Sequence, residues 1–255
     1  MACSAASADE RAALSPPVFL ADDVSGERVV LTGPEGRHAA TVRRVGIGER
    51  VDVVDGRGTR AECTVASVQR DVVELTVLRR VVEPPASPRL VLVQALAKGD
   101  RGELAVELAT EVGIDEVVPW SATRSIVKWD GERGQKALSR WRSTAREAGK
   151  QSRRAWLPVV TEACSTAQVA ERVRGAAGAL VLHEASSRAL AGMSLPSAGE
   201  ILLVVGPEGG VTEAEVAELE AAGAVAVRLG ASVLRTSTAG AAAAAVVSAL
   251  TPRWS

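Results

Sequence analysis

The clearest hydrophobic pattern lies near the carboxyl terminus, where short apolar runs alternate with helical patterns. Residues 201–205 form an unbroken apolar run rich in β-branched side chains, which predicts a buried strand because the run is too short for a helix. Thr212 and Glu215 then form a capping-box pattern, which predicts a helix over 212–222. A second strand is predicted over 224–229.

An Ala-rich helix follows the second strand, and either Thr236 or Ser237 is expected to cap it. The segment therefore runs strand, glycine-rich loop, helix, strand, glycine-containing loop, helix. Two loops then lie at the carboxyl ends of neighbouring parallel strands, which is where open α/β sheets bind ligands.

The middle of the chain repeats this alternation. Residues 89–97 are nearly all apolar and predict a central strand, a helix is expected over 103–112, and a short strand over 115–119 completes a βαβ unit. The unit predicts an α/β fold with a parallel sheet. The helix is expected to bury one stripe, formed by Leu104, Leu108 and Val112.

Short alternating runs separated by turn signals occupy residues 17–83 and predict a small β-barrel as an N-terminal domain. Strands are expected over 29–31, 50–54, 61–68 and 72–77, a turn over 33–36 and a helix over 38–45.

Three prolines within residues 84–88 predict a stiff linker, so the domain boundary is placed there and residues 89–255 form the α/β domain. Residues 1–16 are mostly small and polar, without the apolar core of a signal peptide, and are expected to be a disordered extension.

Composition narrows the possible partners. The 255 residues carry a net charge of -1, so any surface for nucleic acid must be local. With one Phe and no Tyr, a base-stacking platform of the RRM type is not expected. Three scattered cysteines and two histidines suggest no metal site and suit a reducing cytoplasm. The longest apolar stretch, 239–250, is too short to span a bilayer, so no membrane partner is expected.

A local basic surface is predicted between residues 133 and 154, where eight basic residues meet a single acid. Arg142, Arg146, Lys150 and Arg153 recur at helical spacing, which predicts one cationic face of a helix. A polyanion such as RNA is the favoured partner, and an ordinary solvated face is the alternative.

The two glycine-containing loops carry the candidate chemistry. The pentapeptide GPEGG at 206–210 matches neither GxGxxG nor GxxxxGK[ST], so neither a dinucleotide fold nor a P-loop is supported. Taken alone, it is a tight turn. The loop over 229–236 places another glycine directly after a strand, with a leucine and an arginine beside hydroxyl groups, and the pair of loops favours a ligand site.

GPEGG at 206–210 and LGASVLRTSTA at 229–239 together resemble the SPOUT class of RNA methyltransferases and, within it, the RsmE family. Looser matches at His38, 42–44 and 55–56 extend the resemblance into the N-terminal domain. The resemblance implies S-adenosylmethionine as cofactor and methylation of N3 of a uridine in 16S rRNA of the small ribosomal subunit. It also implies a deep trefoil knot in the C-terminal domain, a PUA-like N-terminal barrel that binds RNA, and a homodimer.

On this resemblance, the ends of three strands hold the cofactor. The implied cofactor-binding residues are Leu182, His183, Glu184, Gly206, Pro207, Glu208, Gly209, Gly210, Leu229, Gly230, Ser232, Leu234 and Thr236. A purely structural histidine is the alternative for His183. The implied RNA-binding residues are Arg37, Arg43, Arg44, Arg124, Arg142, Arg146, Lys150, Arg153 and Arg154.

Uracil N3 is a poor nucleophile until it loses its proton, so the reaction needs a base or a group that stabilises the developing anion. Arg235 is the candidate for stabilising that charge. Glu208 is a candidate base that is equally suited to bind the ribose or to cap a helix. The chain departs from the family pattern where Leu108 replaces an expected lysine and Ser237 an expected glutamate, so no acid at 237 is essential.

Two other functions stay open. A SPOUT methyltransferase acting on a ribose 2′-OH or on tRNA would use the same cofactor. A ribosome-assembly protein without enzymatic activity would bind RNA alone, so cofactor binding separates it from both enzymes.

Overall fold

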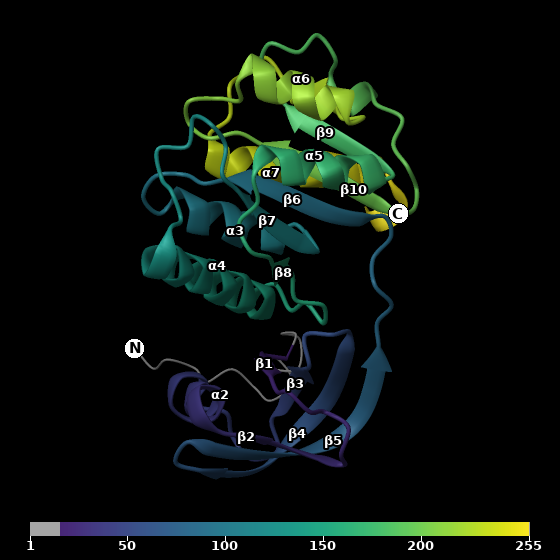
Figure 1. Cartoon of the computed structure of the whole chain (residues 1–255). Helices are drawn as coiled ribbons and strands as arrows, with labels where there is room; N and C mark the ends of the chain where they lie inside the picture. Colours follow the sequence, from purple (N-terminus) through teal and green to yellow (C-terminus); the bar gives the residue numbers. More distant parts are fainter. Residues whose placement is uncertain (1–15, 255) are drawn as a thin grey trace, which may run out of the picture. The chain divides into compact units, whose positions relative to one another are not determined.

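The computed structural model describes residues 16–254 of the chain (Figure 1). Within these residues two compact units are present, 16–84 with 153–156, and 85–152 with 157–254. All but the last residue of the extension expected over 1–16 fall outside the described part of the chain.

The segment 153–156 belongs to the first unit although its neighbours in sequence belong to the second. The guanidinium of Arg60 donates to the carbonyl oxygen of Arg153 at 2.9 Å, and the indole N–H of Trp156 donates to the carbonyl oxygen of Glu83 at 2.8 Å. Sequence patterns did not indicate this excursion of the chain.

The first unit contains a five-stranded, mostly antiparallel sheet in the order β1-β3-β4-β5-β2. Its strands are β1 (Val18–Leu20), β2 (Arg28–Leu31), β3 (Arg50–Val54), β4 (Thr59–Gln69) and β5 (Val72–Val82). The four strands expected here are confirmed, with β5 longer than expected. Strand β1, which pairs in parallel with β3, was missed because three residues carry no periodicity.

Residues 33–43 are helical throughout, so the turn expected over 33–36 is wrong. Helix α2 (Gly33–Arg37) has a proline in its first turn and continues into a π-helical segment, η1 (His38–Arg43). Proline is accommodated at the first position of a helix because the missing N–H would have no intrahelical partner there, so Gly-Pro fits a helix start as well as a turn. The helix ends at Arg44, which has a left-handed φ of +53°.

The second unit contains a six-stranded, all-parallel sheet in the order β11-β9-β10-β6-β7-β8. Its strands are β6 (Arg89–Ala95), β7 (Glu116–Trp120), β8 (Val159–Val160), β9 (Gly178–Leu182), β10 (Glu200–Val205) and β11 (Val225–Val227). The expected α/β fold with a parallel sheet is confirmed, whereas the two-residue β8 was missed.

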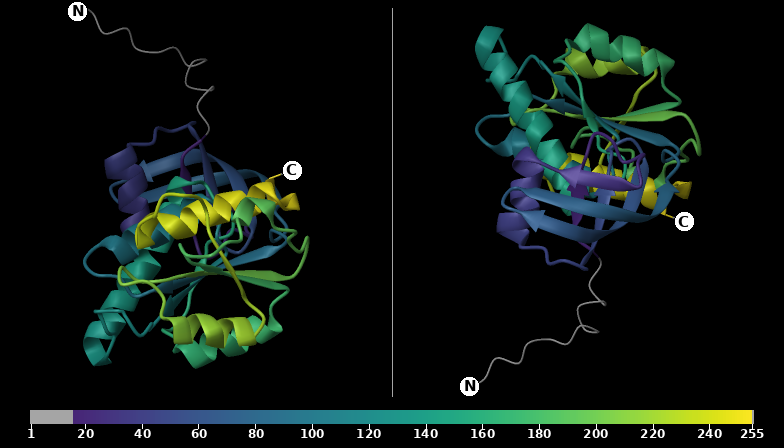
Figure 2. Two further views of the ribbon diagram at one scale, coloured as in Figure 1. Left: turned by 90° about the horizontal axis from the view of Figure 1, so that it is seen from above. Right: turned by 90° about the horizontal axis from the view of Figure 1, so that it is seen from below.

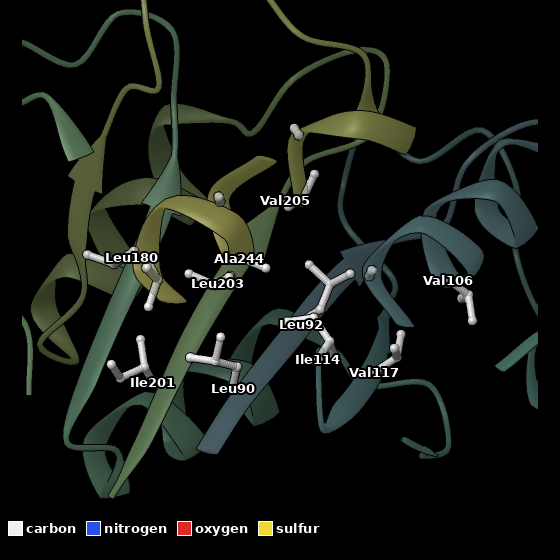
Figure 3. Close-up of a cluster of buried hydrophobic side chains, with 14 of the residues drawn as sticks. Leu90, Leu92, Val106, Ile114, Val117, Leu180, Ile201, Leu203, Val205 and Ala244 are labelled. Atoms are coloured by element: carbon white, nitrogen blue, oxygen red, sulfur yellow. The ribbon is translucent and has the colours of Figure 1, made fainter. Parts of the chain in front are cut away.

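Helices cover both faces of this sheet (Figures 1 and 2). One face packs against α3 (Arg101–Glu111), α4 (Gly131–Gln151) and α7 (Thr236–Ala249), and the other against α5 (Thr166–Gly175) and α6 (Glu213–Ala221). Short 3₁₀ turns occur at η2 (Leu190–Gly192) and η3 (Pro252–Trp254). Figure 3 shows the core under α7, where Leu90, Leu92, Ile201 and Leu203 lie on one face of the central strands.

The buried face of α3 differs from the expected stripe. Leu104 is exposed, and Ala105, Val106 and Ala109 are buried instead. Helix α3 packs against the Ala-rich α7, and small residues on both helices allow a close approach that leucines would prevent. Within residues 16–254 no helix is long and apolar enough to cross a bilayer.

Candidate functional site

A cavity of about 610 Å³ opens at the carboxyl ends of β9, β10 and β11. Its walls are the segments that follow these strands, 182–184, 205–211 and 227–236, together with Arg101 and Ala239. Every residue expected to bind the cofactor lines this cavity. The parallel sheet therefore brings together three loops that are far apart in the sequence.

The loop after β10 is compact because two of its glycines are required. A Cβ on Gly206 would lie 2.6 Å from Cγ2 of Val211, and Gly210 has a left-handed φ of +74°. The N–H of Gly210 donates to the carbonyl oxygen of Pro207 at 2.9 Å. The loop thus folds onto itself, and at its three glycines it has only backbone to present to the cavity.

Two neighbouring segments hold this loop from outside. The guanidinium of Arg124 donates to the carbonyl oxygen of Gly209 at 2.9 Å. The carboxylate of Glu208 accepts hydrogen bonds from the backbone N–H of Lys98 at 3.1 Å and from the guanidinium of Arg101 at 3.2 Å. Arg124, expected to bind RNA, therefore has a partner in the candidate cofactor loop, and its contact with RNA stays a prediction.

The start of α7 is tied to the same loop by buried hydrogen bonds. The hydroxyl of Thr236 donates to the carbonyl oxygen of Gly206 at 2.7 Å and accepts from Nε2 of Gln94 at 2.9 Å. Neither Thr236 nor Ser237 caps α7, whose N-cap residue is Arg235 without a side-chain hydrogen bond. The expected cap is wrong because the Thr236 hydroxyl is committed across the sheet to the loop after β10.

Gln94 is a component of the site that sequence reasoning missed. It is fully buried at the carboxyl end of β6, and within the described residues its Oε1 has no hydrogen-bond partner. The available signal was a single amide side chain inside an otherwise apolar strand pattern.

The third wall of the cavity is built around His183. The backbone N–H of His183 donates to the carbonyl oxygen of Val227 at 2.9 Å, and its ring Nδ1 accepts from the backbone N–H of Ala185 at 3.3 Å. Directly after β11 the chain makes a further backbone hydrogen bond, in which the N–H of Leu190 donates to the carbonyl oxygen of Arg228 at 2.9 Å. The ring of His183 therefore stabilises the turn that follows β9.

The loop over 230–235 is exposed, including its apolar side chains. Val233 is 77% exposed and Leu234 is 40% exposed, and both line the cavity. Arg235 lies beside them, and within residues 16–254 it forms no salt bridge. The cavity therefore offers apolar surface together with Arg235 on the same loop, and the exposed Arg228 of the same wall likewise forms no salt bridge within residues 16–254.

The capping box at the start of α6 is confirmed, since Thr212 and Glu215 exchange hydrogen bonds. Glu215 is buried and also accepts from the N–H of Thr123 at 2.7 Å. Burial raises the pKa of this carboxyl group, but the hydrogen bonds from Thr123 and Thr212 outweigh burial and hold its pKa below the ordinary value. Glu215 is thus a charged anchor between α6 and the loop after β7.

The basic face expected on α4 is only partly present. Lys150 is buried beside Glu147, and Arg142 donates to Glu162 at 3.1 Å. Arg153 lies beyond the end of α4 with a left-handed φ of +58°. The prediction of one cationic face is therefore wrong, because the helix ends before Arg153 and the side chain of Lys150 is buried. Arg146 remains exposed on the helix.

The remaining candidates for RNA binding lie in the first unit. Arg43 and Arg44 are exposed at the end of η1, and Arg37 is exposed with a 3.4 Å contact to Asp71. Arg154 is half-buried in the segment 153–156. Contact of these residues with RNA stays a prediction.

Two protein families match most of the chain. Residues 84–248 match the RNA methyltransferase domain family, and residues 31–78 match the RNA methyltransferase PUA domain family. Ribosomal RNA small subunit methyltransferase E of Mycobacterium tuberculosis is 49% identical over 234 residues, which cover 90% of this chain and 89% of that protein. The Bacillus subtilis protein of the same name is 35% identical over 217 residues, covering 82% of this chain and 85% of its own length.

Solved structures agree with these matches. A ribosomal RNA small subunit methyltransferase E from Neisseria gonorrhoeae, bound to S-adenosylmethionine, superimposes with a TM-score of 0.82 at 27% identity, covering 93% of this chain and 98% of that one. A putative methyltransferase from Legionella pneumophila with bound cofactor SAM gives a TM-score of 0.83 at 25% identity, with coverage of 93% and 99%. The chain therefore belongs to the RsmE family of ribosomal RNA small subunit methyltransferases.

Proposed function

We propose that this protein uses S-adenosylmethionine to methylate N3 of a uridine in 16S rRNA of the small ribosomal subunit. The observation that carries the proposal is the cavity at the carboxyl ends of β9, β10 and β11, which both sequence motifs line. Relatives of the same fold from Neisseria gonorrhoeae and Legionella pneumophila bind this cofactor. A ribosomal RNA substrate assigns the reaction to the cytoplasm.

The cavity fits the cofactor in size and chemistry. Its volume of about 610 Å³ falls within the range of roughly 300–1,000 Å³ typical of small-molecule sites. Exposed backbone after β11, between Leu229 and Leu234, is suited to bind an adenine, with Val233 and Leu234 covering its face. The backbone at Gly206, Gly209 and Gly210 is open to the ribose and methionine parts. When bound, the cofactor supplies an electrophilic methyl group.

The residues of this chain then orient the uracil and stabilise its charge. Positioning alone accounts for a large part of the rate enhancement in bimolecular reactions. Arg235, uncompensated on the cavity loop, is assigned to the negative charge that develops on the uracil oxygens as N3 reacts. Glu208 is retained as a candidate base, but its contacts with Lys98 and Arg101 favour a role in holding the loop and the ribose.

The trefoil knot is part of the same proposal. After β11, at one edge of the sheet, the chain pairs with the segment around Arg188 and Leu190, and α7 then packs on β10 and β6. Such a return of the chain across its own earlier loop is what a knot requires. The described hydrogen bonds among Gln94, Thr236 and Gly206 would tighten it.

We further propose a role for each domain and an oligomeric state for the protein. Residues 17–83 form a barrel-like RNA-binding domain, 84–88 a linker and 89–255 the methyltransferase domain, and the protein acts as a homodimer. The family match over 31–78 to a PUA domain supports the first assignment. The homodimer is proposed from the resemblance of the two loop motifs to the SPOUT class.

Mapping of the modified nucleoside tests the proposal. Small ribosomal subunits that lack the modification are incubated with the protein and S-adenosylmethionine, and the RNA is digested and analysed by mass spectrometry. 3-Methyluridine is the expected product. A methylated ribose, or methylation of tRNA alone, would assign a different substrate to the same cavity. If calorimetry detects no binding of S-adenosylmethionine, the proposal that the protein is a methyltransferase is rejected.

A further inference from the structure

A second cavity, of about 330 Å³, lies in the second unit between the loop after β6 and the first turns of α4. Gly102 and Glu103 line it, whereas the preceding residue, Arg101, lines the cofactor cavity. The two cavities therefore meet at the first turn of α3.

Two tryptophans contribute aromatic surface to this cavity. Trp129 is half-buried, and its ring meets the ring of Trp141 edge to face, with centroids 4.9 Å apart and an interplanar angle of 79°. Trp141 is buried and fixed from behind, because a Cβ on Gly102 would lie 2.6 Å from its ring. The chain has five tryptophans, one phenylalanine and no tyrosine, so this cavity holds two of its six such rings.

Cations form the rim of the same cavity. Lys128 and Arg133 are exposed and, within residues 16–254, form no salt bridge. Arg140 donates to the carboxylate of Glu103 at 3.0 Å, and Glu103 is the single acid of the lining. The lining therefore carries an excess of two positive charges next to a partly exposed aromatic ring.

We propose that this cavity binds one nucleobase of the substrate RNA, distinct from the base that is methylated, with its phosphates on Lys128 and Arg133. A flat aromatic surface beside free cations is the arrangement by which proteins hold single-stranded nucleic acid. The volume lies near the lower end of the range for small-molecule sites, which suits one base with its sugar. The inference rests on the proposed function, since it assigns a second contact to the same RNA.

Substitution of Trp129 tests the stacking. Trp129→Ala is expected to weaken binding of unmodified small-subunit RNA by about 5- to 150-fold, the range for loss of one base–aromatic stack, and to raise the KM for RNA with little change in kcat. Trp129→Phe keeps a ring and is expected to restore most of the affinity. S-adenosylmethionine affinity and the thermal midpoint of each variant report whether the fold is intact. Unchanged RNA affinity in folded Trp129→Ala protein would overturn the inference.

Exposed charges provide a test that does not disturb the core. The double variant Lys128→Gln, Arg133→Gln is expected to reduce the slope of log affinity against log salt by about 1.4, which corresponds to two contacts with single-stranded phosphates. Lys136→Gln is the matched control, because Lys136 is an exposed lysine of α4 outside the cavity, and its slope is expected to stay closer to that of the parent. Equal salt slopes for the double variant and the parent would show that Lys128 and Arg133 do not contact RNA phosphates.

Photo-crosslinking distinguishes an RNA strand from a free nucleotide. RNA carrying 5-iodouridine is expected to crosslink to the peptide that contains Trp129, and excess uridine monophosphate is expected not to compete. Full competition by the mononucleotide, with RNA affinity unaffected by Trp129→Ala, would assign the cavity to a free nucleotide and overturn the inference. Methyl transfer by the parent protein is measured in parallel, so a failed cavity assignment is distinguishable from a failed assignment of the reaction.

Discussion

The side-chain amide of Gln94 donates a 2.9 Å hydrogen bond to the hydroxyl of Thr236, a residue 142 positions away in the sequence. The same hydroxyl donates to the carbonyl oxygen of Gly206 at 2.7 Å. The end of β6, the loop after β10 and the first turn of α7 are thereby joined through one buried oxygen. Both cavity loops that carry the sequence motifs are positioned by this contact.

Thr236→Val is expected to lower cofactor affinity by about tenfold and to destabilise the protein by about 1–3 kcal/mol, because the Gly206 carbonyl loses its donor and the buried Gln94 amide keeps only its 3.2 Å hydrogen bond to the carbonyl oxygen of Ala95. Thr236→Ser keeps the hydroxyl and is expected to behave much like the parent. Calorimetry with S-adenosylmethionine and urea unfolding measure the two effects. Parent-like affinity in the valine variant would show that this oxygen does not position the cavity.

Gly209→Val is expected to weaken S-adenosylmethionine binding by at least about tenfold, which corresponds to ~1.4 kcal/mol, since a displaced loop loses the preorganisation that favours binding. A Cβ at this position would lie 3.2 Å from Cβ of Arg124, so the larger valine is expected to displace either the loop or the arginine. Gly175→Ala, at the end of α5 with open space around its Cβ, is the control and is expected to bind normally. Normal affinity in folded Gly209→Val protein would place the cofactor elsewhere.

Most of the second unit follows from local patterns. The apolar runs at 89–97 and 201–205 predict β6 and β10, and the pair Thr212 and Glu215 predicts α6, because strand burial and helix capping depend on residues close together in the sequence. The motif residues gather at one cavity because parallel strands deliver their following loops to the same edge.

The features that were missed depend on contacts distant in sequence. Whether Leu104 or Val106 of α3 is buried depends on the alanines of α7, which no pattern within α3 reports. Thr236 serves the loop after β10 instead of its own helix, and Trp156 joins the first unit through the carbonyl of Glu83. Side chains that are equally able to make a local or a distant hydrogen bond are assigned only when the packing is known.

Arg235→Gln is expected to lower kcat by about 10²–10³-fold, the usual cost of removing one group that stabilises developing negative charge, with little change in cofactor affinity. Methyl-transfer kinetics and calorimetry with S-adenosylmethionine measure the two quantities.

Glu208→Gln distinguishes the two candidate roles of Glu208, as a base or as a residue that holds the loop. If Glu208 holds the loop through Lys98 and Arg101, the glutamine lowers cofactor affinity and leaves the pH dependence of kcat unchanged. Loss of one limb of the pH profile would identify Glu208 as the base.

Arg146→Gln is expected to weaken RNA binding and to reduce the slope of log affinity against log salt by about 0.7–0.9, as expected for one phosphate contact. Arg146 is an exposed arginine of α4 that forms no salt bridge within residues 16–254, whereas Arg142 pairs with Glu162. Arg174→Gln, an exposed arginine of α5 paired with Glu171, is the control and is expected to leave the slope unchanged. Equal slopes for Arg146→Gln and the parent would mean that this face of α4 is only solvated.

Arg172 joins two carboxylates at the amino-terminal edge of the parallel sheet. Its Nε and Nη2 each donate to Glu200 at 2.9 Å, and it also pairs with the buried Glu116, which Arg89 contacts as well. The Arg172 hydrogen bonds lower the pKa of Glu200. For Glu116, burial raises the pKa, but hydrogen bonds from Arg172 and Arg89 outweigh burial and the pKa lies below the ordinary value.

The stability from these two carboxylates is therefore present above the unfolded glutamate pKa of about 4.3 and is lost as the pH falls through the lower folded values. Arg172→Met is expected to reduce the free energy of unfolding at pH 7 by about 2 kcal/mol, less than the ~3–5 kcal/mol for one partner of a fully buried pair, because the Arg172 side chain is 27% exposed. The difference from the parent is expected to shrink below pH ~4 as both carboxylates become protonated in either protein. Urea unfolding between about pH 3 and pH 8 measures it, with Arg174→Met as an exposed control, and a difference independent of pH would mean that Arg172 stabilises the edge by packing rather than by charge.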